Sequence, residues 1–166
     1  MRELQRLTTE YVETEDRVRI SGELAANGTV VMWLSQRLLV RLLPHLFLWL
    51  EKQSDANIPM EIEQSFAQEA VKAELNTEAP VQSLPESQEW LVEAVDLTPN
   101  ENMLSIRFRT ENGNQETLRL QAFALRQWLE IIHSLWRLAE WPFDVWPEWI
   151  ASNKPASKHG DPAKLH

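Results

Sequence analysis

A nearly continuous apolar segment in the first third of the chain limits most strongly what this sequence can fold into. Ten of the thirteen residues from Leu38 to Leu50 are apolar, and only Arg41, Pro44 and His45 interrupt them. A helix that is apolar around most of its circumference must be covered on several sides, so we expect other elements to wrap around it. The polar interruptions keep the segment below the roughly 18 apolar residues of a membrane span. It therefore predicts a core helix, and no membrane span is expected.

Three strands are predicted before this helix. Apolar and polar residues alternate in part of Leu4–Glu13 and clearly in Arg17–Leu24, and Thr29–Leu34 is rich in strand-forming residues. The Asn27-Gly28 pair is a strong hairpin signal, and Ser35 is placed to cap the helix. Pro44 would either kink the helix or begin a second short one. The first unit is therefore read as strand–strand–strand–helix.

The second half of the chain repeats this order. Its predicted elements are strands at Glu89–Thr98, Met103–Thr110 and Gln115–Gln121, followed by a helix from Ala122 to about Trp141. A three-residue loop ending at Gly113, with this glycine in the left-handed conformation, would pair Ile106 with Leu118 and Leu104 with Leu120. A two-residue loop would place the two apolar sets on opposite faces of the sheet, so the pattern favours the three-residue loop.

Between the two units lies an acidic, proline-punctuated segment. Residues 55–88 are interpreted as a flexible linker, in which Met60–Leu75 could form a helix with Ile62, Phe66, Ala70 and Ala73 on its apolar side. The predicted fold is α+β, with tandem βββα-linker-βββα units packed about a pseudo-two-fold axis as one globule with antiparallel sheets and two main helices. The first unit is predicted at residues 1–54 and the linker at 55–88. The second unit, which includes a Trp- and Pro-rich strip, is predicted at 89–150, and a disordered tail at 151–166.

Charge and cysteine content exclude several classes of function. The formal net charge is −9, which argues against a nucleic-acid partner because such proteins need a basic surface. The chain has no cysteine, which excludes disulfides, thiolate nucleophiles and Cys-ligated metals and fits a reducing, cytoplasmic location. No signal peptide is visible at the N-terminus.

Catalytic groups are weakly marked. His45 and His133 are single helical histidines without ligand spacing, and no glycine-rich phosphate loop is present. Asp96 and Asp144 are the acids in the most apolar surroundings, where burial would raise a carboxyl pKa. We therefore predict no catalytic residue, no metal ligand and no cofactor.

Two groups of residues are predicted to bind partners. The first is the aromatic strip Trp141, Phe143, Trp146 and Trp149, which could dock a partner or instead seal the protein's own core. The second is the arginine face Arg107, Arg109 and Arg119, whose side chains share one side of the predicted hairpin. It could bind an anion, an acidic partner or the acidic linker, or remain a solvated surface.

The function predicted from these features is a non-catalytic protein-interaction or scaffold protein, with a homodimer as one form of the interaction and with unidentified protein partners. It would act through the aromatic strip or an exposed sheet face. The alternative is a small-molecule binding module with a Trp-lined pocket between the halves, touching Trp33, Trp128 or Trp136. A third hypothesis is a hydrolase-type enzyme that uses a helical histidine with Asp96.

Overall fold

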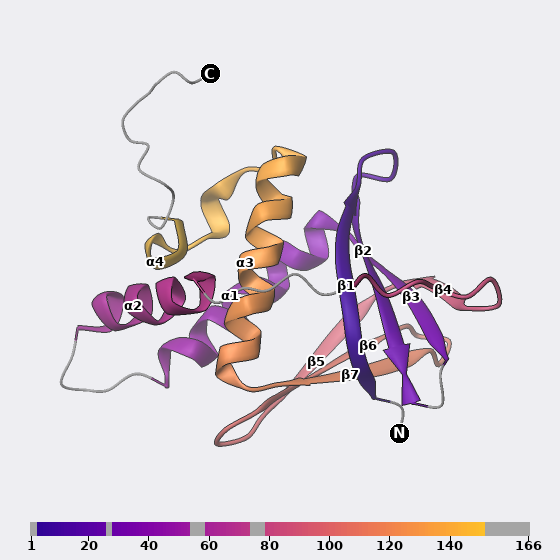
Figure 1. The fold of residues 1–166 in the computed structure, drawn as a ribbon, viewed down its shortest axis with the longest axis horizontal. Helices are drawn as coiled ribbons and strands as arrows, with labels where there is room; N and C mark the ends of the chain where they lie inside the picture. Colours follow the sequence, from indigo (N-terminus) through magenta and orange to yellow (C-terminus); the bar gives the residue numbers. More distant parts are fainter. Residues whose placement is uncertain (1–2, 26–27, 54–58, 74–78, 152–166) are drawn as a thin grey trace.

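Two sheets and a set of helices on one side of them make up the computed structural model, which describes residues 3–25, 28–53, 59–73 and 79–151 (Figure 1). The four-stranded sheet has the order β1 (Leu4–Val12), β2 (Arg17–Leu24), β3 (Thr29–Leu34) and β4 (Gln88–Leu91). The three-stranded sheet has the order β5 (Ala94–Pro99), β6 (Leu104–Arg109) and β7 (Gln115–Leu120). The helices are α1 (Gln36–Glu51), α2 (Met60–Ala73), α3 (Ala122–Ala139), the 3-10 helix η2 (Phe143–Val145) and α4 (Glu148–Ala151). The predicted α+β class is confirmed.

The register predicted for the second hairpin is also confirmed. Ile106 lies opposite Leu118 and Leu104 lies opposite Leu120. Gly113 has a φ of 106°, a conformation that side chains disfavour, as the three-residue loop requires. The burial of Leu104, Ile106 and Leu118 shows why a slip of one residue is excluded, since it would expose this whole apolar set.

The strand predicted at Glu89–Thr98 is wrong in one respect, because the chain forms two strands there that belong to different sheets. β4 pairs with β3, in parallel, whereas β5 pairs with β6 in the antiparallel direction. Trp90 and Val92 are buried, and the next residues that face the core are Val95 and Leu97. The alternation of inward and outward side chains therefore shifts by one residue between Val92 and Val95. At the change, the Val92 N–H donates to the carbonyl of Trp33 on β3. A single flat strand cannot keep both apolar pairs on one face.

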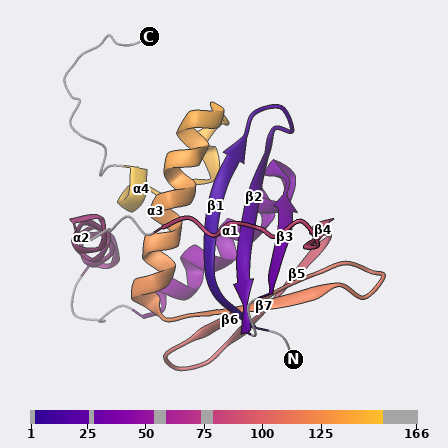
Figure 2. The same cartoon turned by 45° about the vertical axis from the view of Figure 1, so that its right-hand side comes forward.

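The two βββα units are not equivalent in the structure. The first sheet gains the parallel strand β4, so it is not purely antiparallel, and the second sheet has no counterpart of this strand. The βββα order is visible, but the pseudo-two-fold relation is not confirmed. The second sheet runs across the first (Figures 1 and 2), and a bridge between Glu3 and Thr117 joins β7 to the start of the chain. All strands and the long helices α1 and α3 contribute to one hydrophobic core.

Helix α1 is covered on one side and open on the other. Its N-terminus is capped as predicted, since the Ser35 hydroxyl accepts a hydrogen bond from the N–H of Leu38 at 3.1 Å. The helix continues through Pro44, so the hypothesis of a second short helix is wrong. Seven of its residues are buried, but Arg41, Pro44, His45 and Leu48 are exposed. Helix α2, strand β5 and the 3-10 helix η2 contact α1, and its polar interruptions fall together on the side that stays open.

The segment that joins the two units crosses much of the molecule. The helix predicted within it forms as α2 and contacts α1, α3 and α4. Residues 79–87 then run over the outer side of the first sheet, where Thr8 accepts a hydrogen bond from the N–H of Val81 and Thr29 accepts one from the N–H of Leu84 (Figure 2). Residues 54–58 and 74–78 of the linker and residues 152–166 of the predicted tail lie outside the described residues.

Candidate functional site

The aromatic strip folds back into the protein. Trp141, Trp146 and Trp149 are buried, and Phe143 is half-buried. Trp146 packs against Phe47 of α1, with ring centroids 5.4 Å apart, and against Trp136 of α3 at 5.6 Å. Of the two interpretations left open by the sequence, these contacts match the sealing of the protein's own core, and little area of the three tryptophans is left for a partner.

Polar anchors hold both ends of the strip in place. The Trp141 indole N–H donates to Asp16 in the β1–β2 turn at 3.0 Å, and the Trp149 indole donates to Glu51 at the end of α1 at 3.1 Å. Asp16 also accepts a hydrogen bond from the Tyr11 hydroxyl at 2.6 Å. This bond, with a smaller contribution from desolvation, raises the pKa of Tyr11 to about 12, and the same hydrogen bond, with that of Trp141, lowers the pKa of Asp16.

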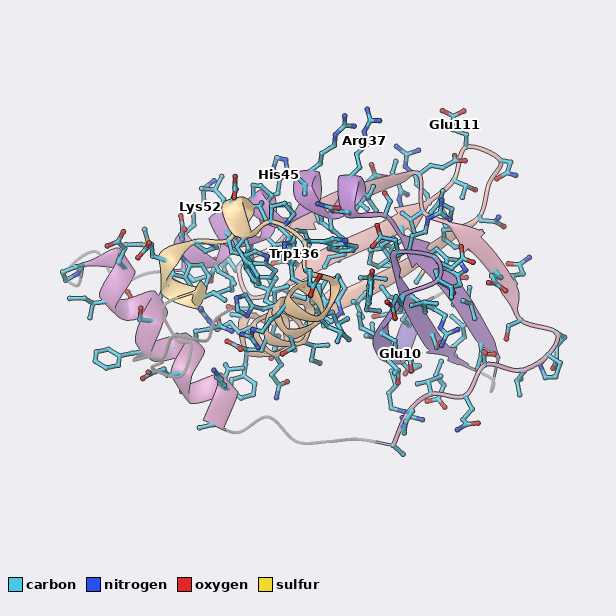
Figure 3. All side chains as sticks on the ribbon, turned by 90° about the horizontal axis from the view of Figure 1, so that it is seen from above. Glu10, Arg37, His45, Lys52, Glu111 and Trp136 are labelled. Atoms are coloured by element: carbon cyan, nitrogen blue, oxygen red, sulfur yellow. The ribbon has the colours of Figure 1, made fainter. Side chains whose placement is uncertain are left out.

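The histidines predicted as catalytic candidates lie in different environments. His133 is buried against the rings of Phe143 and Trp146, at centroid distances of 5.2 and 4.9 Å. His45 is on the open side of α1 and points outward (Figure 3). Asp96 is on the face of β5 opposite to Leu97, which lines a hollow together with His45. The structure therefore does not bring Asp96 to His45, and it packs His133 among aromatic rings.

The arginine face forms as predicted but carries its own counter-charge. Asp96, on the neighbouring strand, accepts hydrogen bonds from Arg109 at 2.7 Å and from Arg107 at 2.8 Å, while Arg119 lies 3.7 Å from Glu3. The bonds from Arg109 and then Arg107 lower the pKa of Asp96, so the expectation that apolar surroundings would raise it is wrong. Arg107 and Arg119 line a hollow of about 250 Å³ that also contains Asp96. This carboxylate reduces the attraction of the face for an anion.

Helix α2 turns its predicted apolar side outward and buries two glutamines together with Val71. Gln64 and Gln68 are 1% and 0% exposed, whereas Ile62 is 50% and Phe66 is 69% exposed. The predicted apolar side, Ile62, Phe66, Ala70 and Ala73, is exposed along its whole length. We call these four residues the α2 stripe.

A buried polar network explains this orientation. Arg126 of α3 donates to the side-chain oxygens of Gln64 at 2.5 Å and Gln68 at 3.2 Å. The amide of Gln68 donates to Glu130 of α3 at 2.8 Å, and that of Gln64 donates to the carbonyl of Leu50 at 3.3 Å. Desolvation lowers the pKa of Arg126 to about 10, because its guanidinium is buried, with the ring of Trp149 5.6 Å away. Buried polar groups need partners, so α3 selects the glutamine side of α2.

The polar residues of α3 carry a sequence signal related to this network. Arg126, Glu130, Ser134 and Arg137 recur on one side of the predicted second helix, a pattern that normally marks a solvent-exposed side. The structure buries Arg126 and Glu130 and leaves Ser134 and Arg137 exposed. Only the glutamines at the matching spacing of four in Met60–Ala73 could have indicated a polar contact between helices.

A further feature was not foreseen, namely a groove along the open side of α1. Two adjoining hollows of about 390 and 260 Å³ lie between α1 and β5, and both are lined by His45 and Leu97. The tryptophan that lines them is Trp49, rather than the Trp33, Trp128 or Trp136 expected for a pocket between the halves.

Within the described ranges, His, Asp and Glu side chains form no group of three or more placed to hold a metal ion. None of the helices in the part of the chain that the structure describes is long and apolar enough to cross a membrane. No protein-family model matches the sequence, and no match is found among curated proteins or among solved structures.

Proposed function

We propose that this chain is a non-catalytic protein-interaction protein that binds a partner through the α2 stripe. The observation that carries the proposal is the outward direction of Ile62 and Phe66 on a helix whose glutamines are buried. A helix packed on a globular protein ordinarily turns its apolar side inward. Single exposed apolar residues are common, but several on one side of a helix are typical of a contact surface.

The apolar area of this surface would contribute a few kcal/mol to binding. Full burial of one large apolar side chain is worth roughly 1.5–3 kcal/mol, and Phe66 and Ile62 retain much of that when the chain is alone. A partner that covers both residues would recover it. Binding would not have to disturb the network beneath α2, because Gln64 and Gln68 are on the other side of the helix.

The charge around the stripe indicates the chemistry of the partner. Helix α2 carries three acids, Glu61, Glu63 and Glu69, and one basic residue, Lys72, so its formal charge is −2. Glu61 and Glu69 are exposed on α2 itself. A second copy of α2 would bring like charges together, whereas an amphipathic helix with basic residues beside its apolar ones would be attracted. We therefore propose a basic amphipathic helix of another protein as the partner.

The state of the candidate catalytic groups supports binding rather than catalysis as the activity. Asp96 is held by Arg107 and Arg109, and His133 is enclosed by Phe143 and Trp146. A general base must reach the proton that it removes, and these two groups are already engaged within the protein.

The test uses a synthetic helical peptide with leucine on one side and lysine on the other, and the same peptide with glutamate in place of lysine. The full chain should bind the lysine peptide, with NMR shift changes confined to α2. The double variant Ile62→Ser/Phe66→Ser should lose this binding. Leu138→Ser is the matched control, because Leu138 is 67% exposed on α3 and away from the stripe.

Two results would contradict the proposal. One is equal binding of the lysine peptide to wild type and to the double variant, and the other is a preference for the glutamate peptide. Sedimentation of the chain alone adds a further check. A dimer that becomes monomeric in the double variant would mean that a second copy, and not a basic partner, covers the α2 stripe.

A further inference from the structure

The groove between α1 and β5 is separate from the α2 stripe and has a different chemistry. Leu48 of α1, 50% exposed, and Leu97 of β5 line the larger of its two hollows. Arg41 lines the smaller hollow and Lys52 the larger one, and His45 lines both. The groove thus has apolar residues along its length and basic residues at both ends. One acid, Glu93, also lines the smaller hollow, and its carboxylate accepts a hydrogen bond from the N–H of Glu111 at 2.7 Å.

One wall of the groove is an edge strand. β5 is the terminal strand of its sheet, and of the strands that the structure describes, only β6 pairs with it. Its other edge carries backbone N–H and C=O groups that can pair with an added strand. Proteins often guard such edges with charged side chains or proline. Here Pro99 is at the end of the strand, and the carboxylate of Asp96 is directed to Arg107 and Arg109 of the neighbouring strand.

The other wall, helix α1, carries positively charged side chains. Arg37, Arg41 and Lys52 form no ion pair with any residue that the structure describes. Arg37, His45 and Lys52 lie along one edge of the molecule and point outward (Figure 3). Glu51, the acid at the end of α1, accepts a hydrogen bond from Trp149. In a chain of net charge −9, this is a locally basic surface.

We propose that this groove binds an extended, acidic segment of a partner protein, which adds to the second sheet as a strand beside β5. Backbone hydrogen bonds to the free edge of β5 would supply affinity, and alternate side chains of the segment would face α1. Apolar side chains would cover Leu48 and Leu97, and acidic ones would pair with Arg41 and Lys52. Since β5 has six residues, the bound segment is of similar length.

The chain's own acidic segment does not fill this role in its described parts. α2 is held by Arg126, and Arg6 donates to the carbonyl of Ala79 at 2.5 Å on the first sheet. The groove prefers an acidic partner and the α2 stripe prefers a basic one, so one chain could hold both partners at once. This would make the protein a scaffold, and the groove does not depend on the proposed role of α2.

The experiment uses the full chain and a synthetic peptide of alternating valine and glutamate, with a valine–lysine peptide for comparison. The acidic peptide should bind, slow hydrogen exchange at β5 amides and leave α2 unchanged. Arg41→Glu/Lys52→Glu should weaken binding by about tenfold or more because two attractive contacts become repulsive. Arg137→Glu, an exposed change on α3, is the matched control and should bind as wild type.

Strand addition is tested by N-methylating alternate residues of the acidic peptide, which removes backbone donors and leaves the charge intact. Loss of binding in one of the two methylation registers is expected. The idea is overturned if both methylated peptides bind as well as the parent, or if Arg41→Glu/Lys52→Glu has no effect. Protection of β5 by self-association without peptide would also overturn it. The Ile62→Ser/Phe66→Ser variant should bind the acidic peptide normally, so failure at one surface is distinguishable from failure at the other.

Discussion

The aromatic strip and helix α2 both carry large apolar side chains, yet the first is buried and the second is turned outward. In the strip, the indole N–H groups at the two ends have acceptors, since Trp141 donates to Asp16 and Trp149 to Glu51, and only that of Trp146 is buried without a partner among the described residues. In α2 the neighbouring surface of α3 is itself polar, and Arg126 requires the glutamine side. The comparison shows that buried polar partners, as well as hydrophobicity, decide which side of an element faces the core.

The largest difference is expected in the contribution of each region to stability. Trp146→Ala should lower the free energy of unfolding by about 3–5 kcal/mol, because it leaves a cavity between α1 and α3. Phe66→Ala should change it by less than about 0.5 kcal/mol, since Phe66 is mostly exposed. Chemical denaturation followed by circular dichroism measures both. Similar losses of unfolding free energy in the two variants would contradict the difference between the buried strip and the exposed α2 stripe.

A smaller loss is expected when the polar support of α2 is removed. Arg126→Met leaves the buried oxygens of Gln64 and Gln68 without their donor, which costs on the order of 1–3 kcal/mol. The loss should be local, so hydrogen exchange should become faster in α2 while β5–β7 keep their protection. Arg137→Met is the matched control on the exposed side of α3. Unchanged protection of α2 in the Arg126 variant would show that the network does not determine its orientation.

The smallest effect on stability is expected from the hydrogen bonds that Asp16 accepts at one end of the aromatic strip. Tyr11 is the only tyrosine, so tyrosinate absorbance should report its pKa of about 12, above the usual tyrosine pKa of 10.0. Because the folded value is the higher one, its contribution to stability is fully present below about pH 10 and is lost as pH rises through 12. Asp16→Asn should move the titration toward 10. A wild-type midpoint near 10, with the helical signal intact, would mean that the anchor does not form in solution.

Local rules were enough to predict much of the fold from the sequence. Alternation and one glycine set the β6–β7 register, and Ser35 marked the start of α1. The division of Glu89–Thr98 into β4 and β5 was missed, although the apolar positions change phase between Val92 and Val95. The sequence could have indicated this change of phase. It could not indicate which strands β4 and β5 pair with, because the pairing of β4 with β3 joins segments that are distant in the sequence.

The candidate sites were harder to predict than the strands. Trp141, Phe143, Trp146 and Trp149 were correctly recognised as a unit, but whether they bind a partner stays a prediction, and the structure places the three tryptophans in the core. The sequence grouped Arg107, Arg109 and Arg119 correctly, yet it could not show that Asp96 lies between two of them across the strands. The groove depends on the distance between α1 and β5, which no local pattern encodes.

The parallel pairing of β3 with β4 has a consequence for biosynthesis. Val30 lies opposite Gln88, so the first sheet is incomplete until more than half of the chain has left the ribosome. Until then the nascent chain carries α1 with Leu43, Leu46 and Leu50, which the finished protein hides completely, and no Trp146 or Ile106 to cover them. A stalled or truncated product that ends before the second unit would thus expose the apolar side of α1. We expect chaperones to bind this exposed helix.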